Sequence, residues 1–237
     1  MNVLAIGNSF SEDAMRYLHD MAKKEGEKIT TMNLYIGGCP LRTHYLNTIS
    51  DAYKYNLVFN GYATDVMVSI KQALISREWD YITLQQASPV SFDFETYEPY
   101  LTSLYEYVKK YCPKAKILIH QTWAYENESP SMLKTNFTTH EEMFKKIEKA
   151  YKLAYKSIKA DGLIPCGSVV AELYGKGFKM HRDGKHISFG IGRYALALTW
   201  FKFLTGKNVV NNDFIPFDGE MTEEERKAVI EVVSSLK

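Results

Sequence analysis

The chain has 237 residues, of which 46% are hydrophobic and 24% are charged. This length and composition fit a single globular domain over residues 1–237, with enough apolar side chains for a sizeable core. The 29 basic residues nearly balance the 28 acidic ones, and the net charge of +1 gives no electrostatic basis for binding nucleic acid.

The sequence also argues against a membrane protein or a disulfide-stabilised one. No stretch reaches the length of a membrane span, so we expect no membrane partner. The first predicted strand begins at Val3, and we expect a cytoplasmic protein, although removal of a signal peptide would leave the same sequence. The cysteines, Cys39, Cys112 and Cys166, are odd in number and lack metal-type spacing, which predicts free thiols.

Apolar runs alternate with amphipathic stretches, the pattern of a parallel sheet with helices on both faces. Strands are predicted at residues 3–6, 28–36, 81–84, 116–120 and 163–164. Helices are predicted at residues 12–25, 70–77, 97–111, 138–160, 168–174, 189–204 and 222–236.

Two segments fall outside this alternation. Residues 43–68 are less regular, but residues 55–59 and 63–68 flank Asn60-Gly61, which predicts a hairpin at the rim of the sheet. Residues 123–136 are rich in Asn, Ser and Pro, which predicts a loop over the active face.

The first strand leads directly into a polar turn that presents Ser9. Open α/β sheets bind their ligands at the carboxyl ends of strands, and the backbone N–H groups of such a turn can stabilise an oxyanion. The alternative is that Ser9 or Ser11 only caps the following helix. Ser11 is the better candidate for the cap, because Asp13 and the helix follow it directly, and this leaves Ser9 free for chemistry.

Far downstream, Asp183 precedes His186 by three residues. This spacing lets the carboxylate orient the imidazole while the other ring nitrogen stays free to meet a serine hydroxyl. One alternative takes His181, Asp183 and His186 as metal ligands, although no pattern elsewhere completes a coordination shell. A second is a capping Asp and a surface His in an ordinary turn.

Three other strand ends carry candidate groups. Gly37-Gly38 follow the second strand, where glycine permits a free N–H to face a bound anion, and the neighbouring Cys39 is expected to be a packed thiol. Gln85 and Gln86 follow the strand at 81–84, where a side-chain amide could donate to an oxyanion. The last rim candidates come from the fourth parallel strand and the loop after it: His120, Trp123 and Tyr125.

These pieces together resemble a known superfamily. The run Gly7-Asn8-Ser9-Phe10-Ser11 resembles the first block of the SGNH (GDSL-type) hydrolases, and Asp183-Gly184-Lys185-His186 resembles their last, Asp-x-x-His block. The combination of the first run with Trp79-Asp80-Tyr81 and Leu84-Gln85-Gln86 is similar to the DUF4886 branch of that superfamily.

The resemblance implies a flavodoxin-like three-layer α/β/α sandwich with a five-stranded parallel sheet, and the activity of a serine esterase or acetylesterase. It makes Ser9 the nucleophile, His186 the base and Asp183 its orienting partner. The backbone N–H groups of Ser9 and Gly38 would be two oxyanion donors.

The chain departs from the superfamily pattern at two places. Asn8 stands where an Asp is usual, and the Gly-x-Asn-Asp block that supplies the third oxyanion donor is missing. Gln85 or Gln86 is the predicted substitute.

We therefore expect two-step acyl transfer that needs no metal or organic cofactor. The expected partner is a small acyl ester, with an O-acetylated sugar as the first choice. The substrate-binding residues would be Asn8, His120, Trp123 and Tyr125. Two alternatives stay open: a non-catalytic carbohydrate-binding protein that keeps the fold, and a metal-dependent hydrolase.

Overall fold

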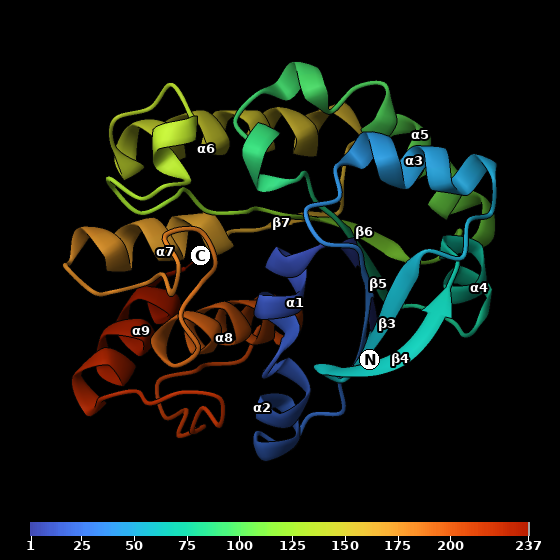
Figure 1. The fold of residues 1–237 in the computed structure, drawn as a ribbon. Coiled ribbons are helices and arrows are strands. Elements are labelled where there is room, and N and C mark those ends of the chain that lie inside the picture. The colour runs from blue at the N-terminus through green and yellow to red at the C-terminus, as the bar shows by residue number, and fades with distance from the viewer. Residues whose placement is uncertain (237) are drawn as a thin grey trace.

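The protein is built around one mixed β-sheet, and the computed structural model describes residues 1–236 of it. The strand order is β4-β3-β2-β1-β5-β6-β7 (Figure 1). The strands are β1 (Asn2–Gly7), β2 (Thr30–Tyr35), β3 (Tyr55–Phe59), β4 (Tyr62–Val68), β5 (Tyr81–Leu84), β6 (Lys116–His120) and β7 (Gly162–Ile164).

The sheet is larger than predicted. Strands β2, β1, β5, β6 and β7 pair in parallel, whereas β3 and β4 are antiparallel. The expected five-stranded sheet is therefore corrected to seven strands, because the Asn60-Gly61 hairpin joins the β2 edge and extends the parallel part. Its strands pair through Phe59 and Tyr62.

The centre of the sheet is apolar on both faces. In β1, residues 3–6 are almost completely buried, and Ile6 pairs with Leu34 of β2 and Leu84 of β5. Strands covered on both sides read as continuous apolar runs, which is why the sequence identified them.

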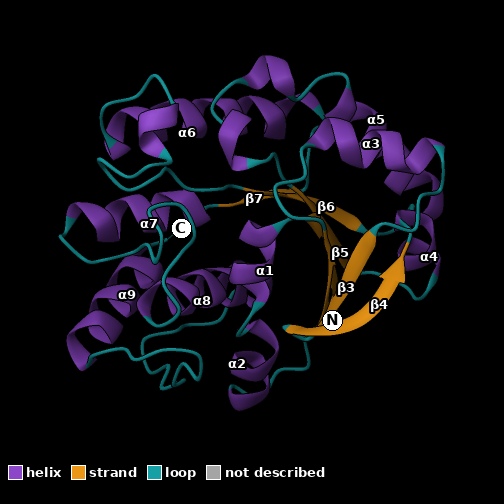
Figure 2. Cartoon of the chain, in the orientation of Figure 1, coloured by secondary structure: helices purple, strands orange, loops and turns teal. Residues whose placement is uncertain are grey.

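The helices form two layers (Figure 2). Helices α1, α2 and α8 pack together on one face, with α9 outside α8, and α3, α4, α5 and α6 lie on the other face. Helix α7 lies at the β7 edge, between α6 and α8. Within residues 1–236, no helix is both long and apolar enough to cross a membrane. The helices are α1 (Ser9–Met15), α2 (Leu18–Lys24), α3 (Leu41–Ile49), α4 (Ile70–Ile75), α5 (Tyr100–Tyr111), α6 (His140–Ser157), α7 (Cys166–Gly175), α8 (Ile191–Thr205) and α9 (Glu223–Ser235).

Two helical predictions need correction. The single helix expected over residues 12–25 is the pair α1 and α2, and α1 begins earlier, because the Asn8 side chain caps it. Helix α3 was not predicted, because part of its buried face is polar and breaks the apolar periodicity. Its buried polar residues are His44, Asn47 and Thr48.

Candidate active site

The candidate nucleophile, Ser9, is the first residue of α1 and is separated from the end of β1 only by Asn8. Asn8 is the N-cap: its side chain accepts a hydrogen bond from Phe10 N at 3.0 Å. Ser11 closes the capping box by accepting from Asn8 N at 3.1 Å. The cap is therefore Asn8 rather than Ser11 as predicted, and the Ser9 hydroxyl takes no part in capping.

Only glycine fits immediately before this turn. A Cβ on Gly7 would come within 2.1 Å of Ser11 Oγ and 3.3 Å of Gln85 Cδ. The chain can therefore enter α1 closely enough for the Gln85 side chain to lie against the turn that presents Ser9.

His186 faces Ser9 from the other end of the sequence. Its Nε2 lies 3.0 Å from Ser9 Oγ, and its Nδ1 lies 2.6 Å from Asp183 Oδ2. Because an ionised carboxylate only accepts hydrogen bonds, Nδ1 carries the proton and Nε2 presents a lone pair to the serine hydroxyl. The structure thus brings together the Ser, His and Asp that the sequence singled out.

Asp183 is held as an anion inside its own turn. Partial burial opposes ionisation, but the hydrogen bonds from the His186 ring and from the backbone N–H groups of His186 and Lys185 lower the pKa of Asp183 to about 2. Asp183 is therefore ionised at neutral pH and fixes the imidazole tautomer.

Gly38 lies beside this turn, after the end of β2. Its φ of +62° is in the left-handed region, which glycine adopts without strain. The side chain of Asn8 donates to Cys39 O at 3.2 Å and so joins the Gly38 loop to the nucleophile turn. The Cys39 thiol is buried, which raises its pKa to about 12, and this agrees with a packed thiol rather than a nucleophile.

The two glutamines have different surroundings. Gln85 Nε2 donates to Asn8 Oδ1 at 2.8 Å, and within residues 1–236 this is the only hydrogen bond that it donates. Gln86 Nε2 donates both to Thr96 O and to Thr96 Oγ1, while its Oε1 accepts from Leu41 N. Gln86 therefore organises loops, and Gln85 alone of the pair keeps an uncommitted N–H beside the nucleophile turn.

The residues predicted to contact substrate lie in the interior instead. Asn8, His120, Trp123 and Tyr125 each expose 3% of their surface or less. Burial lowers the pKa of His120 to about 3, so its ring is neutral, and its Nδ1 contacts Gln85 Oε1. We correct their predicted role accordingly: they support the site from behind and do not form a pocket wall.

The metal-site alternative finds no support in the geometry. The buried His181 donates from Nε2 to Ala124 O at 3.0 Å, while Asp183 is bonded to His186. Among residues 1–236, no three His, Cys, Asp or Glu side chains are grouped so that they could hold a metal ion.

Sequence reasoning missed a group of charged residues beside the site. Asp13 is buried on α1, and its carboxylate accepts hydrogen bonds from Arg182 and Arg193. Two sequence signals could have identified it: Asp13 follows Ser9 by one helical turn, and Arg182 directly precedes Asp183.

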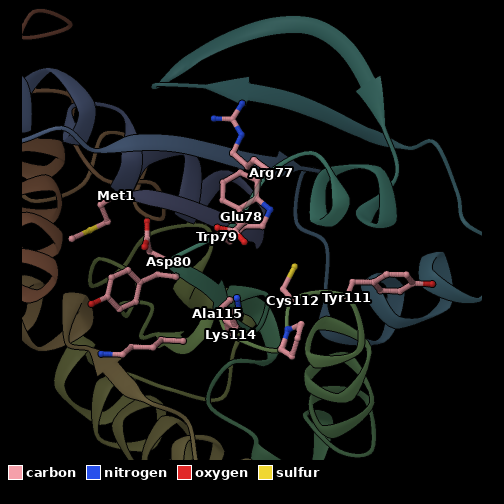
Figure 3. Close-up of a pocket in the computed structure, with 12 residues that line it drawn as sticks. Met1, Arg77, Glu78, Trp79, Asp80, Tyr111, Cys112, Lys114 and Ala115 are labelled. Atoms are coloured by element: carbon pink, nitrogen blue, oxygen red, sulfur yellow. The ribbon is translucent and has the colours of Figure 1, made fainter.

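A cavity of about 710 Å³ lies elsewhere (Figure 3). Its lining includes Met1, Asp80 and Lys116, which stand at the amino ends of β1, β5 and β6. Because these strands are parallel, the cavity lies at the end of the sheet where they begin, and Ser9 lies at the opposite end, where they finish. It is therefore not the space in which Ser9 and His186 would act.

The comparisons with known proteins agree with this architecture. Residues 2–229 match the family described as "Domain of unknown function (DUF4886)". A DUF4886 family protein from Bacteroides uniformis ATCC 8492 has a structure with a TM-score of 0.91 and 33% sequence identity, over 99% of this chain and 93% of that one. No curated protein matches the chain.

More distant structures share the fold. A candidate SGNH hydrolase from Slackia heliotrinireducens has a TM-score of 0.60 at 20% identity, over 86% of this chain and 98% of that one. The lipase/acylhydrolase from Enterococcus faecalis has a TM-score of 0.54 at 14% identity, over 86% of this chain and 95% of that one. The chain belongs to the DUF4886 family, and its fold is that of the SGNH (GDSL-type) hydrolases.

Proposed function

We propose that the protein is a serine ester hydrolase that works through an acyl-enzyme on Ser9. The observation that carries this proposal is a continuous chain of hydrogen bonds through three side chains. Asp183 Oδ2 lies 2.6 Å from His186 Nδ1, and His186 Nε2 lies 3.0 Å from Ser9 Oγ. An ionised carboxylate, an imidazole in a fixed tautomer and a hydroxyl in this order are the parts of a nucleophilic triad.

The contact between Ser9 Oγ and His186 Nε2 provides a proton path for both steps of the reaction. As Ser9 Oγ attacks the ester carbonyl, its proton passes to His186 Nε2, and the carbonyl oxygen becomes an oxyanion. His186 then gives that proton to the leaving alkoxide, which departs as the alcohol. Water, deprotonated by His186, attacks the acyl-enzyme, releases the carboxylic acid and restores the Ser9 hydroxyl.

The oxyanion needs donors that already point at its position. We assign this role to the backbone N–H groups of Ser9 and Gly38 and to the Gln85 side-chain amide. Ser9 and Gly38 lie at the carboxyl ends of the paired strands β1 and β2. Gln85 Nε2 donates only to Asn8 Oδ1 within residues 1–236, which leaves its second N–H available, whereas Gln86 Nε2 donates to both Thr96 O and Thr96 Oγ1.

The proposed substrate is a small acyl ester, with acetyl as the acyl group and an O-acetylated sugar as the first candidate. Support for ester chemistry comes from the triad and from the fold shared with the lipase/acylhydrolase from Enterococcus faecalis. The Trp123 and Tyr125 rings are buried, so they offer no stacking surface for a sugar. The carbohydrate part of the proposal therefore rests on the resemblance to acetylesterases.

The test compares p-nitrophenyl acetate, butyrate and octanoate as substrates of the wild type, Ser9→Ala and Ser50→Ala. Ser50 is an exposed serine at the end of α3 and serves as the matched control. We expect acetate to be the fastest substrate, Ser9→Ala to be inactive while folded, and Ser50→Ala to match the wild type. Release of acetate from an O-acetylated xylo-oligosaccharide tests the sugar. Equal turnover by folded Ser9→Ala would contradict the proposal.

A further inference from the structure

Asp13 lies one helical turn after Ser9, on the same face of α1. Its side chain is 1% exposed, and its carboxylate accepts a hydrogen bond from Arg182, which directly precedes Asp183. An anion this deeply buried is stable only when it is paired and hydrogen-bonded.

The partners of Asp13 come from the other half of the site. Arg182 Nη1 donates to both carboxylate oxygens of Asp13, at 3.0 and 2.9 Å, and Arg193 Nε donates to Oδ1 at 2.8 Å. Arg182 directly precedes Asp183, and Arg193 lies in the first turn of α8. The carboxylate thus joins the helix of the nucleophile to the segment of the base.

Arg182 also closes the turn that contains Asp183 and His186. Its backbone N–H donates to His186 O at 3.0 Å, and its Nη1 donates to Ile187 O. His181 and Ile187 form an isolated β-bridge just outside. These contacts of Arg182 close the turn at its base, and the Arg182–Asp13 ion pair joins the base of the turn to α1.

We propose that Asp13 is a positioning residue that holds His186 Nε2 in line with Ser9 Oγ by anchoring Arg182. The inference rests on the proposed function for its effect on hydrolysis, but not for its effect on the His186 ring. Two links connect the same pieces of chain: Ser9 to His186, and Asp13 to Arg182. A displacement of catalytic groups by about 1 Å costs about 100-fold in rate. The Asp13–Arg182 ion pair therefore controls the rate by fixing the distance between His186 Nε2 and Ser9 Oγ.

A neighbouring acid provides a matched control. Asp218 accepts hydrogen bonds from Arg16 and Arg193, at 2.6 and 2.5 Å, and so belongs to the same group of charges. No hydrogen bond of Asp218 within residues 1–236 reaches the segment from residue 181 to residue 187. Loss of the Asp218 charge perturbs the ion pairs with Arg16 and Arg193 and leaves the contacts of Arg182 with the turn intact.

The experiment uses protein labelled with ¹⁵N-histidine, with the His186 signals assigned by their loss in His186→Ala. In the wild type and in Asp218→Asn we expect the His186 ring nitrogens to report one tautomer, protonated at Nδ1. In Asp13→Asn we expect Asp183 to keep the proton on Nδ1 and the Nε2 signal to shift, because its hydrogen bond from Ser9 Oγ weakens. We also expect kcat for p-nitrophenyl acetate to fall about 10- to 100-fold, with KM within about twofold.

A second variant covers a failure of Asp13→Asn to fold. Arg182→Gln removes the anchor but keeps the Asp13–Arg193 pair, and we expect the same changes in the Nε2 signal and in kcat. Unchanged His186 signals in either folded variant would overturn the proposal. If the wild type cleaves no ester and the His186 signals still respond to Asp13→Asn alone, the proposed function fails and the positioning role stands.

Discussion

The indole of Trp123 stacks on the Phe10 ring, with ring centroids 4.1 Å apart and planes 6° from parallel. Phe10 directly follows Ser9 in α1. Trp123 Nε1 donates to Lys185 O at 3.0 Å, next to His186. One buried side chain therefore contacts the segments that carry the nucleophile and the base.

Replacing Trp123 by Phe should lower both stability and activity. The variant keeps an aromatic ring for Phe10 but leaves Lys185 O without its donor, and a lost hydrogen bond of this kind costs about 1 kcal/mol. We expect kcat to fall about 10-fold through displacement of the His186 turn. Trp79→Phe is the control, because Trp79 Nε1 also donates to a backbone carbonyl, Ala73 O at 3.0 Å, far from Ser9. Equal kcat values in the two variants would contradict this role.

The two glutamines should separate catalysis from folding. Gln85→Ala removes the proposed oxyanion donor, and the loss of one such donor costs roughly 3 kcal/mol of transition-state stabilisation, or about 100-fold in kcat. Gln86→Ala removes acceptors and donors that serve Leu41 and Thr96, so it should lower stability and leave kcat near that of the wild type. Steady-state kinetics and urea unfolding of both variants test this, and the opposite pattern would assign the donor to Gln86.

Gly38 should be sensitive to a single methyl group. A Cβ there meets no atom within 4 Å, but the φ of +62° costs an alanine roughly 1 kcal/mol, and relief of that strain turns the N–H away from the oxyanion. We expect Gly38→Ala to lose about 10-fold or more in kcat. Gly37→Ala is the adjacent control, since its φ is not in the left-handed region. Full activity of Gly38→Ala would remove Gly38 from the oxyanion site.

The lowered pKa of Asp183 predicts a pH-dependent contribution to stability. Hydrogen bonds from His186 and Lys185, acting against partial burial, lower this pKa from 3.8 to about 2. Stability from the ionised Asp183 is therefore fully present above about pH 4 and is lost as pH falls through 2. The side chain is 49% exposed, so solvent screening limits the contribution to about 1 kcal/mol or less.

Urea unfolding of the wild type and of Asp183→Asn between pH 7 and pH 2 measures this contribution. The difference in unfolding free energy should shrink towards pH 2, and a constant difference would contradict the assignment. At pH 7 we expect Asp183→Asn to lose about 10⁴-fold in kcat, because the amide cannot hold the reactive imidazole tautomer.

Local patterns predicted much of the fold. The parallel strands are apolar runs buried on both faces, and Asn60-Gly61 marked the hairpin. The same patterns could not show that the hairpin would extend the sheet to seven strands, because pairing at an edge depends on the packing of the whole domain.

The candidate site divides in the same way. Ser9, Asp183 and His186 stand in short motifs, and the structure brings them together, while their catalytic roles stay predictions. Asp13 and Arg182 are 169 residues apart, so no local pattern connects them. An aromatic residue in a polar loop, such as Trp123, reads the same in the sequence whether its ring lies inside or outside.

The most direct test of the account is covalent labelling of the folded protein with a fluorophosphonate, read by intact mass and peptide mapping. Attack by an activated Ser9 Oγ on phosphorus expels fluoride and leaves a stable phosphonyl-serine. The account predicts one label per chain, on Ser9, absent in Ser9→Ala and strongly slowed in His186→Ala. A folded wild type that takes no label, or a label on another serine, would contradict it.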